Sequence, residues 1–149
     1  MTFRLSKRSH ERLIGVNKEL VQVVNLAIGK SKVDFGVSEG LRSVERQREL
    51  VEQGASQTMK SMHITGRAVD LVAYIGPKVC WELNVYDDVA EAMREAAREL
   101  QVPVRWGAAW NIDDITKWEG TMEEAMNHYI DTRRKEGRRP FIDAPHFEI

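Results

Sequence analysis

The chain has 149 residues, the length of one ordinary domain, and its 42% hydrophobic and 30% charged residues are typical of a globular protein. A single cysteine excludes an internal disulfide, and no apolar run approaches the roughly 18–20 residues of a membrane-spanning helix. Because 22 Lys and Arg residues balance 23 Asp and Glu residues, the net charge of −1 argues against a dedicated nucleic-acid binder. The segment 1–12 lacks the apolar stretch and the cleavage site of a secretory signal peptide. No linker rich in Pro, Gly or Ser divides the chain, so we expect one domain over 1–149.

The spacing of apolar residues predicts both helices and short strands. Helical spacing predicts helices over 10–29, from 44 to an end at Gly54, over 86–101 and over 121–135. Short apolar runs predict strands over 33–38, 68–74, 102–107 and 147–149, and residues 55–66 are expected to form a loop. Because these elements do not alternate as regular β-α-β units, their order favours an α+β fold.

Local signals refine two of the helices. Ser9 is predicted to cap the first helix, and Thr121 with Glu124 forms a capping box before the last one. In the second helix, the apolar residues Val44, Leu50 and Val51 are expected to face the core.

Two of the four histidines lie close in sequence to carboxylates. Asp70 follows His63 by seven residues, with Gly66 between them to let the chain bend back, and His146 lies near the C-terminus. Two imidazoles and one carboxylate form a common catalytic zinc set that leaves a fourth position for water. On spacing alone, the alternative that His63 is a surface loop residue and Asp70 caps a turn stays open.

Four ordered motifs give these residues a context. They are Ser61-x-His63-x-x-Gly66-x-Ala68-x-Asp70, Asp143-x-x-His146, Arg42 directly after a predicted strand, and Arg105-Trp106-Gly107-x-x-Trp110. Together, from about residue 33 to 149, they resemble the signatures of the VanX/VanY-type zinc peptidases, the LAS group of D-Ala-D-Ala peptidases. Within that group the chain looks most similar to the single-domain phage endolysins that act as L-alanyl-D-glutamate endopeptidases.

The resemblance implies a LAS or hedgehog-like peptidase fold, with a small, mainly antiparallel sheet flanked by helices and a zinc site in a cleft over the sheet. It makes His63, Asp70 and His146 the zinc ligands. Asp143 would be the general base that takes a proton from the zinc-bound water. Arg42 would pair with the oxygen of the scissile carbonyl or with a substrate carboxylate.

Further residues receive roles by position. Ser61 would hydrogen-bond the substrate. Trp106 and Trp110 are interpreted as cleft residues, with Trp110 assigned to the substrate, and the alternative that at least one of them belongs to the aromatic core stays open. Many carboxypeptidase and dipeptidase members of the group have glutamate as the base, so Asp143 agrees better with the endopeptidase branch. Glu148 is expected either to orient His146 or to be an exposed carboxylate on a strand.

Two segments near the C-terminus have open alternatives. Residues 111–141 are interpreted as a lid or a wall of the substrate site. The basic tract 133–139 is interpreted as solvated cations at a helix C-terminus or as a contact for an anionic wall polymer.

The resemblance therefore implies a zinc endopeptidase that cuts the peptidoglycan stem peptide between L-Ala and D-Glu and causes host cell lysis, without a separate wall-binding domain. We expect a monomer in the host cytoplasm, without stable membrane association, that reaches the periplasmic wall after a holin opens the membrane. The alternatives are a D-Ala-D-Ala carboxypeptidase or dipeptidase with the same zinc chemistry, and a wall-binding module without turnover. The complete set of ligands and base argues against the binding module.

Overall fold

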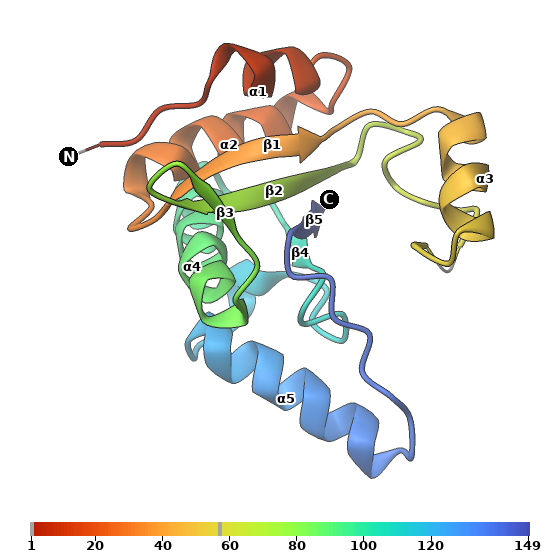
Figure 1. Cartoon of the computed structure of the whole chain (residues 1–149). Coiled ribbons are helices and arrows are strands. Elements are labelled where there is room, and N and C mark those ends of the chain that lie inside the picture. The colour runs from red at the N-terminus through yellow and green to blue at the C-terminus, as the bar shows by residue number, and fades with distance from the viewer. Residues whose placement is uncertain (1, 57) are drawn as a thin grey trace.

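The computed structural model describes residues 2–56 and 58–149, which form helices around a five-stranded sheet (Figure 1). Met1 of the N-terminal segment and Gln57 of the expected loop over 55–66 lie outside the described residues. The helices are α1 (Lys7–Arg12), α2 (Lys18–Lys30), α3 (Val44–Glu52), α4 (Leu83–Leu100) and α5 (Met122–Lys135), with a 3-10 turn η1 (Ile115–Lys117). The strands are β1 (Asp34–Glu39), β2 (Ala68–Ile75), β3 (Lys78–Cys80), β4 (Arg105–Trp106) and β5 (His146–Glu148). None of the helices in the described part of the chain is both long and apolar enough to cross a membrane.

Strand β2 organises the sheet because it pairs antiparallel with β1, β3 and β5. The strand order is β1-β2-β5-β4, and β3 pairs with the C-terminal part of β2. The register sets Asp70 opposite Glu39 of β1 on one side and opposite His146 of β5 on the other. One row across the sheet therefore carries three polar residues. The sheet and its flanking helices confirm the expected α+β fold with a mainly antiparallel sheet.

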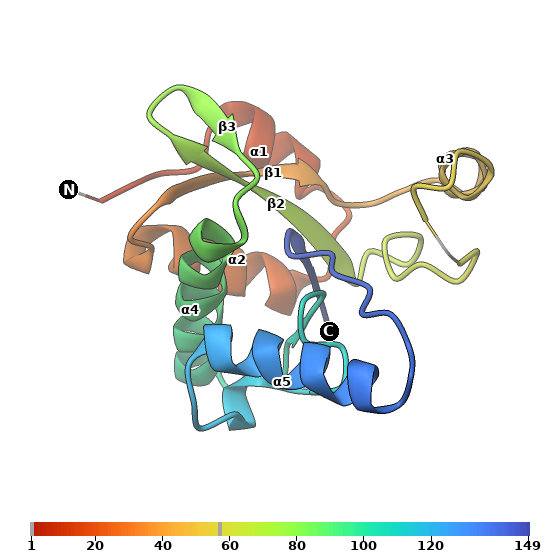
Figure 2. The ribbon, with the colours of Figure 1, turned by 60° about the horizontal axis from the view of Figure 1, so that its bottom comes forward.

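Helices α2 and α4 build the core, packed against each other beneath the β1–β2 pair in the view of Figure 2. Both helices bury apolar side chains at helical spacing, including Leu20, Val23, Val24 and Ala27 of α2 and Val89, Met93, Ala96 and Ala97 of α4. Helix α5 packs on α4 at the end that lies away from the β1–β2 pair (Figure 1). The predicted capping box begins α5, which buries Met122, Ala125, Met126 and Tyr129.

The single helix predicted over 10–29 is wrong. The chain forms two helices there, α1 and α2, separated by a turn in which Gly15 has a φ of +88°. Ser9 does not cap a helix; it is buried within α1, and its Oγ accepts the Val37 N–H of β1 at 2.9 Å. The apolar period ran through the turn because the turn residues also face the core, namely Leu13 and Val16.

The predicted inner face of α3 is also wrong. Val44 is 45% exposed, and Leu50 and Val51 are only half-buried. The side chain that α3 buries is Gln47, with 0% of its surface exposed. Helix α3 is therefore anchored by polar contacts rather than by an apolar face, which a pattern of hydrophobic residues does not reveal.

The short strands differ from the prediction at their ends. Strand β3 was not predicted, because its residues Lys78 and Val79 are exposed and lack an apolar alternation. The expected strand over 102–107 is reduced to the two residues of β4, since Val102 and Val104 are buried without pairing in the sheet. Strand β5 begins one residue earlier than expected, at His146.

Gly107, directly after β4, allows the loop before β5 to pack closely on the sheet edge. A Cβ atom at this position would lie 2.2 Å from the Asp143 carbonyl oxygen and 2.9 Å from the Cβ of His146. In its place, the Gly107 N–H donates to the His146 carbonyl and the Gly107 carbonyl accepts the Asp143 N–H, both at 2.8 Å. The backbone of Gly107 thus fixes the loop that carries two of the predicted site residues.

We predict that Gly107→Ala lowers the free energy of unfolding by about 1–3 kcal/mol, because the added methyl group forces the 143–146 loop away from the sheet. Thermal unfolding measures this loss. The matched control is Gly29→Ala in α2, where a Cβ meets only ordinary contact at 3.7 Å. That substitution should raise stability by up to about 1 kcal/mol because alanine favours the helix. Equal effects of the two substitutions would contradict the packing role of Gly107.

Candidate metal centre and active-site cleft

The sheet register and one turn bring the three predicted metal ligands together. Asp70 of β2 and His146 of β5 are direct partners across the strands. His63 reaches them from the turn that precedes β2. Their ligand atoms lie within 4.8 Å of one another, and Asp70 Oδ1 is 3.2 Å from both His63 Nε2 and His146 Nδ1.

The partners of each histidine fix which ring nitrogen carries its proton. His63 Nδ1 donates to the Gly40 carbonyl at 2.8 Å, because a carbonyl only accepts, and Nε2 is left with its lone pair. His146 Nε2 donates to Glu148 Oε1 at 2.7 Å, which leaves Nδ1 facing Asp70. Glu148 therefore orients His146, and its side chain is only 12% exposed. The two ring nitrogens and the Asp70 oxygen that converge here are donor atoms of the kind that hold a metal ion.

The two spacings from Asp70 Oδ1 match those between ligand atoms of one tetrahedral metal ion. Two ligand atoms at the usual zinc distances of about 2.0–2.1 Å in tetrahedral geometry lie about 3.3 Å apart. The two separations of 3.2 Å from Asp70 Oδ1 agree with this value. Two imidazole nitrogens and one carboxylate oxygen suit a borderline metal, and three protein ligands leave a fourth position for water or substrate.

The charges of the site shift the pKa values of its members. Burial opposes ionisation of Asp70, but hydrogen bonds with His146 and His63 outweigh it and hold the pKa of Asp70 far below its usual value. Burial also lowers the pKa of His146, yet the carboxylates of Asp70 and Glu148 raise it to about 9. In the metal-free protein, His146 is thus protonated near neutral pH and pairs with the Asp70 carboxylate.

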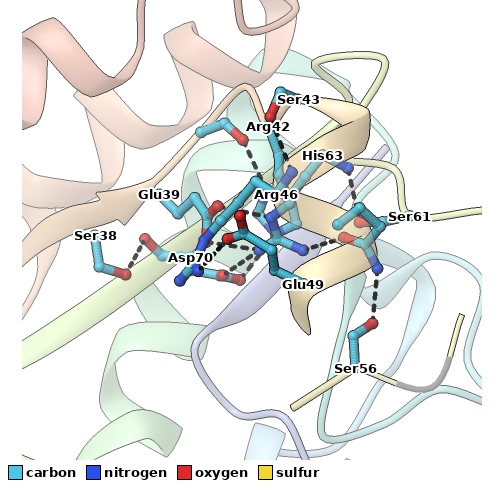
Figure 3. A network of polar contacts seen from close by, with 12 residues as sticks. Ser38, Glu39, Arg42, Ser43, Arg46, Glu49, Ser56, Ser61, His63 and Asp70 are labelled. Atoms are coloured by element: carbon cyan, nitrogen blue, oxygen red, sulfur yellow. Dashed lines mark hydrogen bonds and ion pairs between the residues drawn. The ribbon is translucent and has the colours of Figure 1, made fainter. Parts of the chain in front are cut away.

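Arg42 lies beside Asp70 and is held by several polar contacts (Figure 3). Its Nε and Nη2 donate to the two carboxylate oxygens of Glu39 at 2.6 and 2.7 Å, and its Nη1 donates to Gln47 Oε1 at 2.6 Å. Nη2 is 3.5 Å from Asp70 Oδ2, and the Arg42 N–H donates to the His63 carbonyl at 2.9 Å. Arg42 is therefore tied to two of the three ligands, with only 7% of its side chain exposed.

Two members of this network, Glu39 and Gln47, were missed from the sequence. Glu39 precedes Arg42 by three residues at the end of a strand, a spacing too common to indicate a contact. Gln47 lies on the same helical face as Val44 and Val51, so a polar residue within an apolar stripe was the available signal.

A cleft of about 630 Å³ opens over the site. Besides Arg42 and the three converging residues, the predicted site residues Asp143, Ser61 and Trp110 line it, together with Phe141. Burial and the neighbouring charge of Asp70 raise the pKa of Asp143, which strengthens its carboxylate as a proton acceptor. The Ser61 Oγ accepts the His63 N–H at 3.2 Å, so the serine hydroxyl proton remains free to donate.

The two tryptophans of the Arg105–Trp110 segment take different places. Trp106 is fully buried, and its Nε1 donates to the Ala144 carbonyl at 2.7 Å, which supports the loop before β5. The Trp110 ring lies 5.2 Å from the His146 ring and 6.3 Å from Phe141. Trp110 therefore forms a cleft wall beside a ligand, and Phe141 extends this wall from the segment 111–141.

The other two histidines lie away from the cleft. His10 and His128 are both exposed, and His128 Nδ1 contacts the Asn111 side chain at 3.2 Å. In the basic tract 133–139, the Arg133 guanidinium donates to the Arg139 carbonyl at 2.9 and 3.1 Å. Arg133 therefore binds the chain that follows the C-terminus of α5.

Residues 1–149 match the family model of the phage L-alanyl-D-glutamate peptidases. The chain belongs to this family. It is 36% identical over 115 residues to the L-alanyl-D-glutamate peptidase of Escherichia phage T5, a match that covers 74% of this chain and 84% of that protein. The L-alanyl-D-glutamate peptidase of Listeria phage A118 is 33% identical over 79 residues, which are 53% of this chain and 27% of that protein. The crystal structure of Serratia marcescens L-Ala D-Glu endopeptidase ChiX matches with a TM-score of 0.72 and 40% identity, over 98% of this chain and 89% of that one.

The pKa of His146 predicts that metal binding releases a proton. At pH 7.5 this imidazole is protonated in the metal-free protein, since its pKa is about 9, and it must be neutral to bind a metal. Calorimetric titration with zinc in buffers of different ionisation enthalpy should therefore show release of about one proton for each ion. Folding raises the pKa of His146 from 6.5 to about 9, so the bound proton stabilises the metal-free fold. This stabilisation is complete below pH 6.5 and is lost as the pH rises through about 9.

Glu148→Gln is the matched variant for this measurement. It keeps the shape of the side chain but removes one of the carboxylates that raise the pKa of His146, so fewer protons should be released at pH 7.5. Zinc binding without proton release in the unaltered protein would show that His146 is not the titrating ligand.

Proposed function

We propose that this family member is a zinc-dependent endopeptidase that hydrolyses the L-Ala–D-Glu bond of the peptidoglycan stem peptide. The observation that carries the proposal is the convergence of His63, Asp70 and His146 beside Asp143 in one cleft. Membership of the phage L-alanyl-D-glutamate peptidase family supports the choice of bond. The relatives from phages T5 and A118 and the endopeptidase ChiX bear names with the same specificity.

His63, Asp70 and His146 would hold the metal through Nε2, Oδ1 and Nδ1. When bound, zinc lowers the pKa of a water molecule toward about 7 and polarises a carbonyl group. Glu148 and the Gly40 carbonyl keep both imidazoles in the tautomers that such binding needs.

Asp143 is assigned as the general base. Its carboxylate accepts a proton from the water that attacks the L-Ala carbonyl carbon, and then delivers this proton to the leaving nitrogen of D-Glu. The bond between that carbon and nitrogen breaks, which leaves a carboxyl group on L-Ala and a free amine on D-Glu. The loop carrying Asp143 is fixed by Gly107 at 2.8 Å, so the base is held in place before the substrate arrives.

Arg42, Ser61 and Trp110 are assigned to the substrate. Among the described residues, Arg42 has a partner for only one N–H of Nη1, and its charge favours either the oxyanion of the scissile carbonyl or a substrate carboxylate. The Ser61 hydroxyl donates to the peptide, and the Trp110 ring packs against it.

The biological setting follows from the same proposal. The protein accumulates as a monomer in the host bacterial cytoplasm, needs no stable membrane association, and acts on the periplasmic wall after a holin opens the membrane. The wall is its partner, and its action causes host cell lysis.

The first test is mass spectrometry of the products from purified Gram-negative peptidoglycan. We expect fragments with a new D-Glu amino terminus, loss of these fragments with a zinc chelator, and their return after zinc is added. Release of free D-Ala would instead support the D-Ala-D-Ala carboxypeptidase alternative with the same zinc chemistry. Absence of any product with zinc present would refute the peptidase and favour a wall-binding module.

Asp143→Asn tests the base. The amide has the same shape but cannot take up the proton, so kcat should fall by about 10²–10⁴ while the zinc content stays unchanged. The control is Asp113→Asn, an exposed carboxylate outside the cleft lining, which should leave kcat as it is. An Asp143→Asn variant with normal kcat would assign the base to another group.

A further inference from the structure

Helix α3 has an unusual interior. Its fully buried side chain is the amide of Gln47. The other residues of α3 are exposed or half-buried. An amide loses hydration when it is buried, so it persists in such a place only where its hydrogen bonds are replaced. The contacts of Gln47 therefore show what the helix is built to hold.

The contacts of Gln47 use both ends of its amide group. Oε1 accepts from Arg42 Nη1 at 2.6 Å, and Nε2 donates to Ser56 Oγ at 2.8 Å and to the Thr58 carbonyl. The guanidinium can only donate and the Thr58 carbonyl can only accept, so the orientation of the amide is fixed by its partners. Gln47 thus connects Arg42 to Ser56 and Thr58, which also line the cleft.

A neutral acceptor matters at this place. Arg42 already faces the carboxylates of Glu39 and Asp70, so a third carboxylate would neutralise its charge further. The amide of Gln47 fixes Nη1 without adding negative charge. It leaves the guanidinium available to attract negative charge in the cleft.

We propose that Gln47 is a positioning residue for this reaction, which sets the orientation of Arg42 and holds Ser56 and Thr58 of the cleft wall against it. The inference rests on the proposed function, since Arg42 is assigned there to the substrate. In the described part of the chain, Gln47 makes no hydrogen bond with the three converging residues, so its effect passes through Arg42 rather than through the metal.

The test is a double-mutant cycle on kcat, with peptidoglycan fragments as substrate. Gln47→Met, which keeps the length but loses the polar contacts, should lower kcat at least about tenfold with unchanged zinc content. In an Arg42→Ala background, the same substitution should change kcat by less than about twofold. Equal effects in both backgrounds would overturn the proposal, because a merely structural role would act independently of Arg42. Gln53→Met at the exposed end of α3 is the matched control and should leave kcat unchanged.

A second readout does not depend on activity. In the NMR spectrum of the arginine side chains, the bond to Gln47 restricts rotation of the Arg42 Nη1 group, and Gln47→Met should release it. Gln47→Glu keeps an acceptor on a side chain of the same length, so the Arg42 signal should stay restricted in this variant. If Gln47→Met does not fold, loss of the restricted signal in Gln47→Glu would contradict the proposal. Unchanged Arg42 signals in Gln47→Met would overturn the proposal. A wild-type protein that shows the restricted Arg42 signal but releases no D-Glu fragments would refute the proposed function alone.

Discussion

The site depends on the buried carboxylate of Asp70. Its Oδ1 lies 3.2 Å from both His63 Nε2 and His146 Nδ1, and these contacts hold the pKa of Asp70 far below its usual value. In the metal-free protein, Asp70 and Glu148 raise the pKa of His146 to about 9, so this imidazole carries a proton that a metal ion bound there would displace. Folding and metal binding are thereby linked through one titrating group.

The rest of the cleft compensates the same concentration of negative charge. Glu39, Asp70, Asp143 and Glu148 all line the cleft, and the Arg42 guanidinium pairs with both Glu39 and Asp70. Glu39 holds the guanidinium in a bidentate pair, which gives Arg42 a fixed direction at the expense of part of its charge. The buried side chain of α3, Gln47, is polar because it binds Arg42 rather than packing in the hydrophobic core.

The scaffold places the site on the sheet and on a loop bound to it. Two of the converging residues lie in one row of the sheet, whose strands rest on the α2–α4 core. Asp143, the proposed base, lies on a loop held to the sheet by the backbone of Gly107. Trp110 and Phe141, which lie outside the helices and strands, form the cleft wall beside His146.

The sequence by itself determined the α+β class, most of the helices and strands, and the family, because local periodicity and ordered motifs carry this information. It also predicted the three residues that the fold brings together as a candidate metal site. It did not determine the break between α1 and α2, since the apolar period continues through the turn at Gly15. The roles of Glu39, Gln47 and Glu148 were decided only by the tertiary structure. These side chains act through contacts that depend on strand register and on a turn far along the chain, and such contacts leave no periodic signal in the sequence.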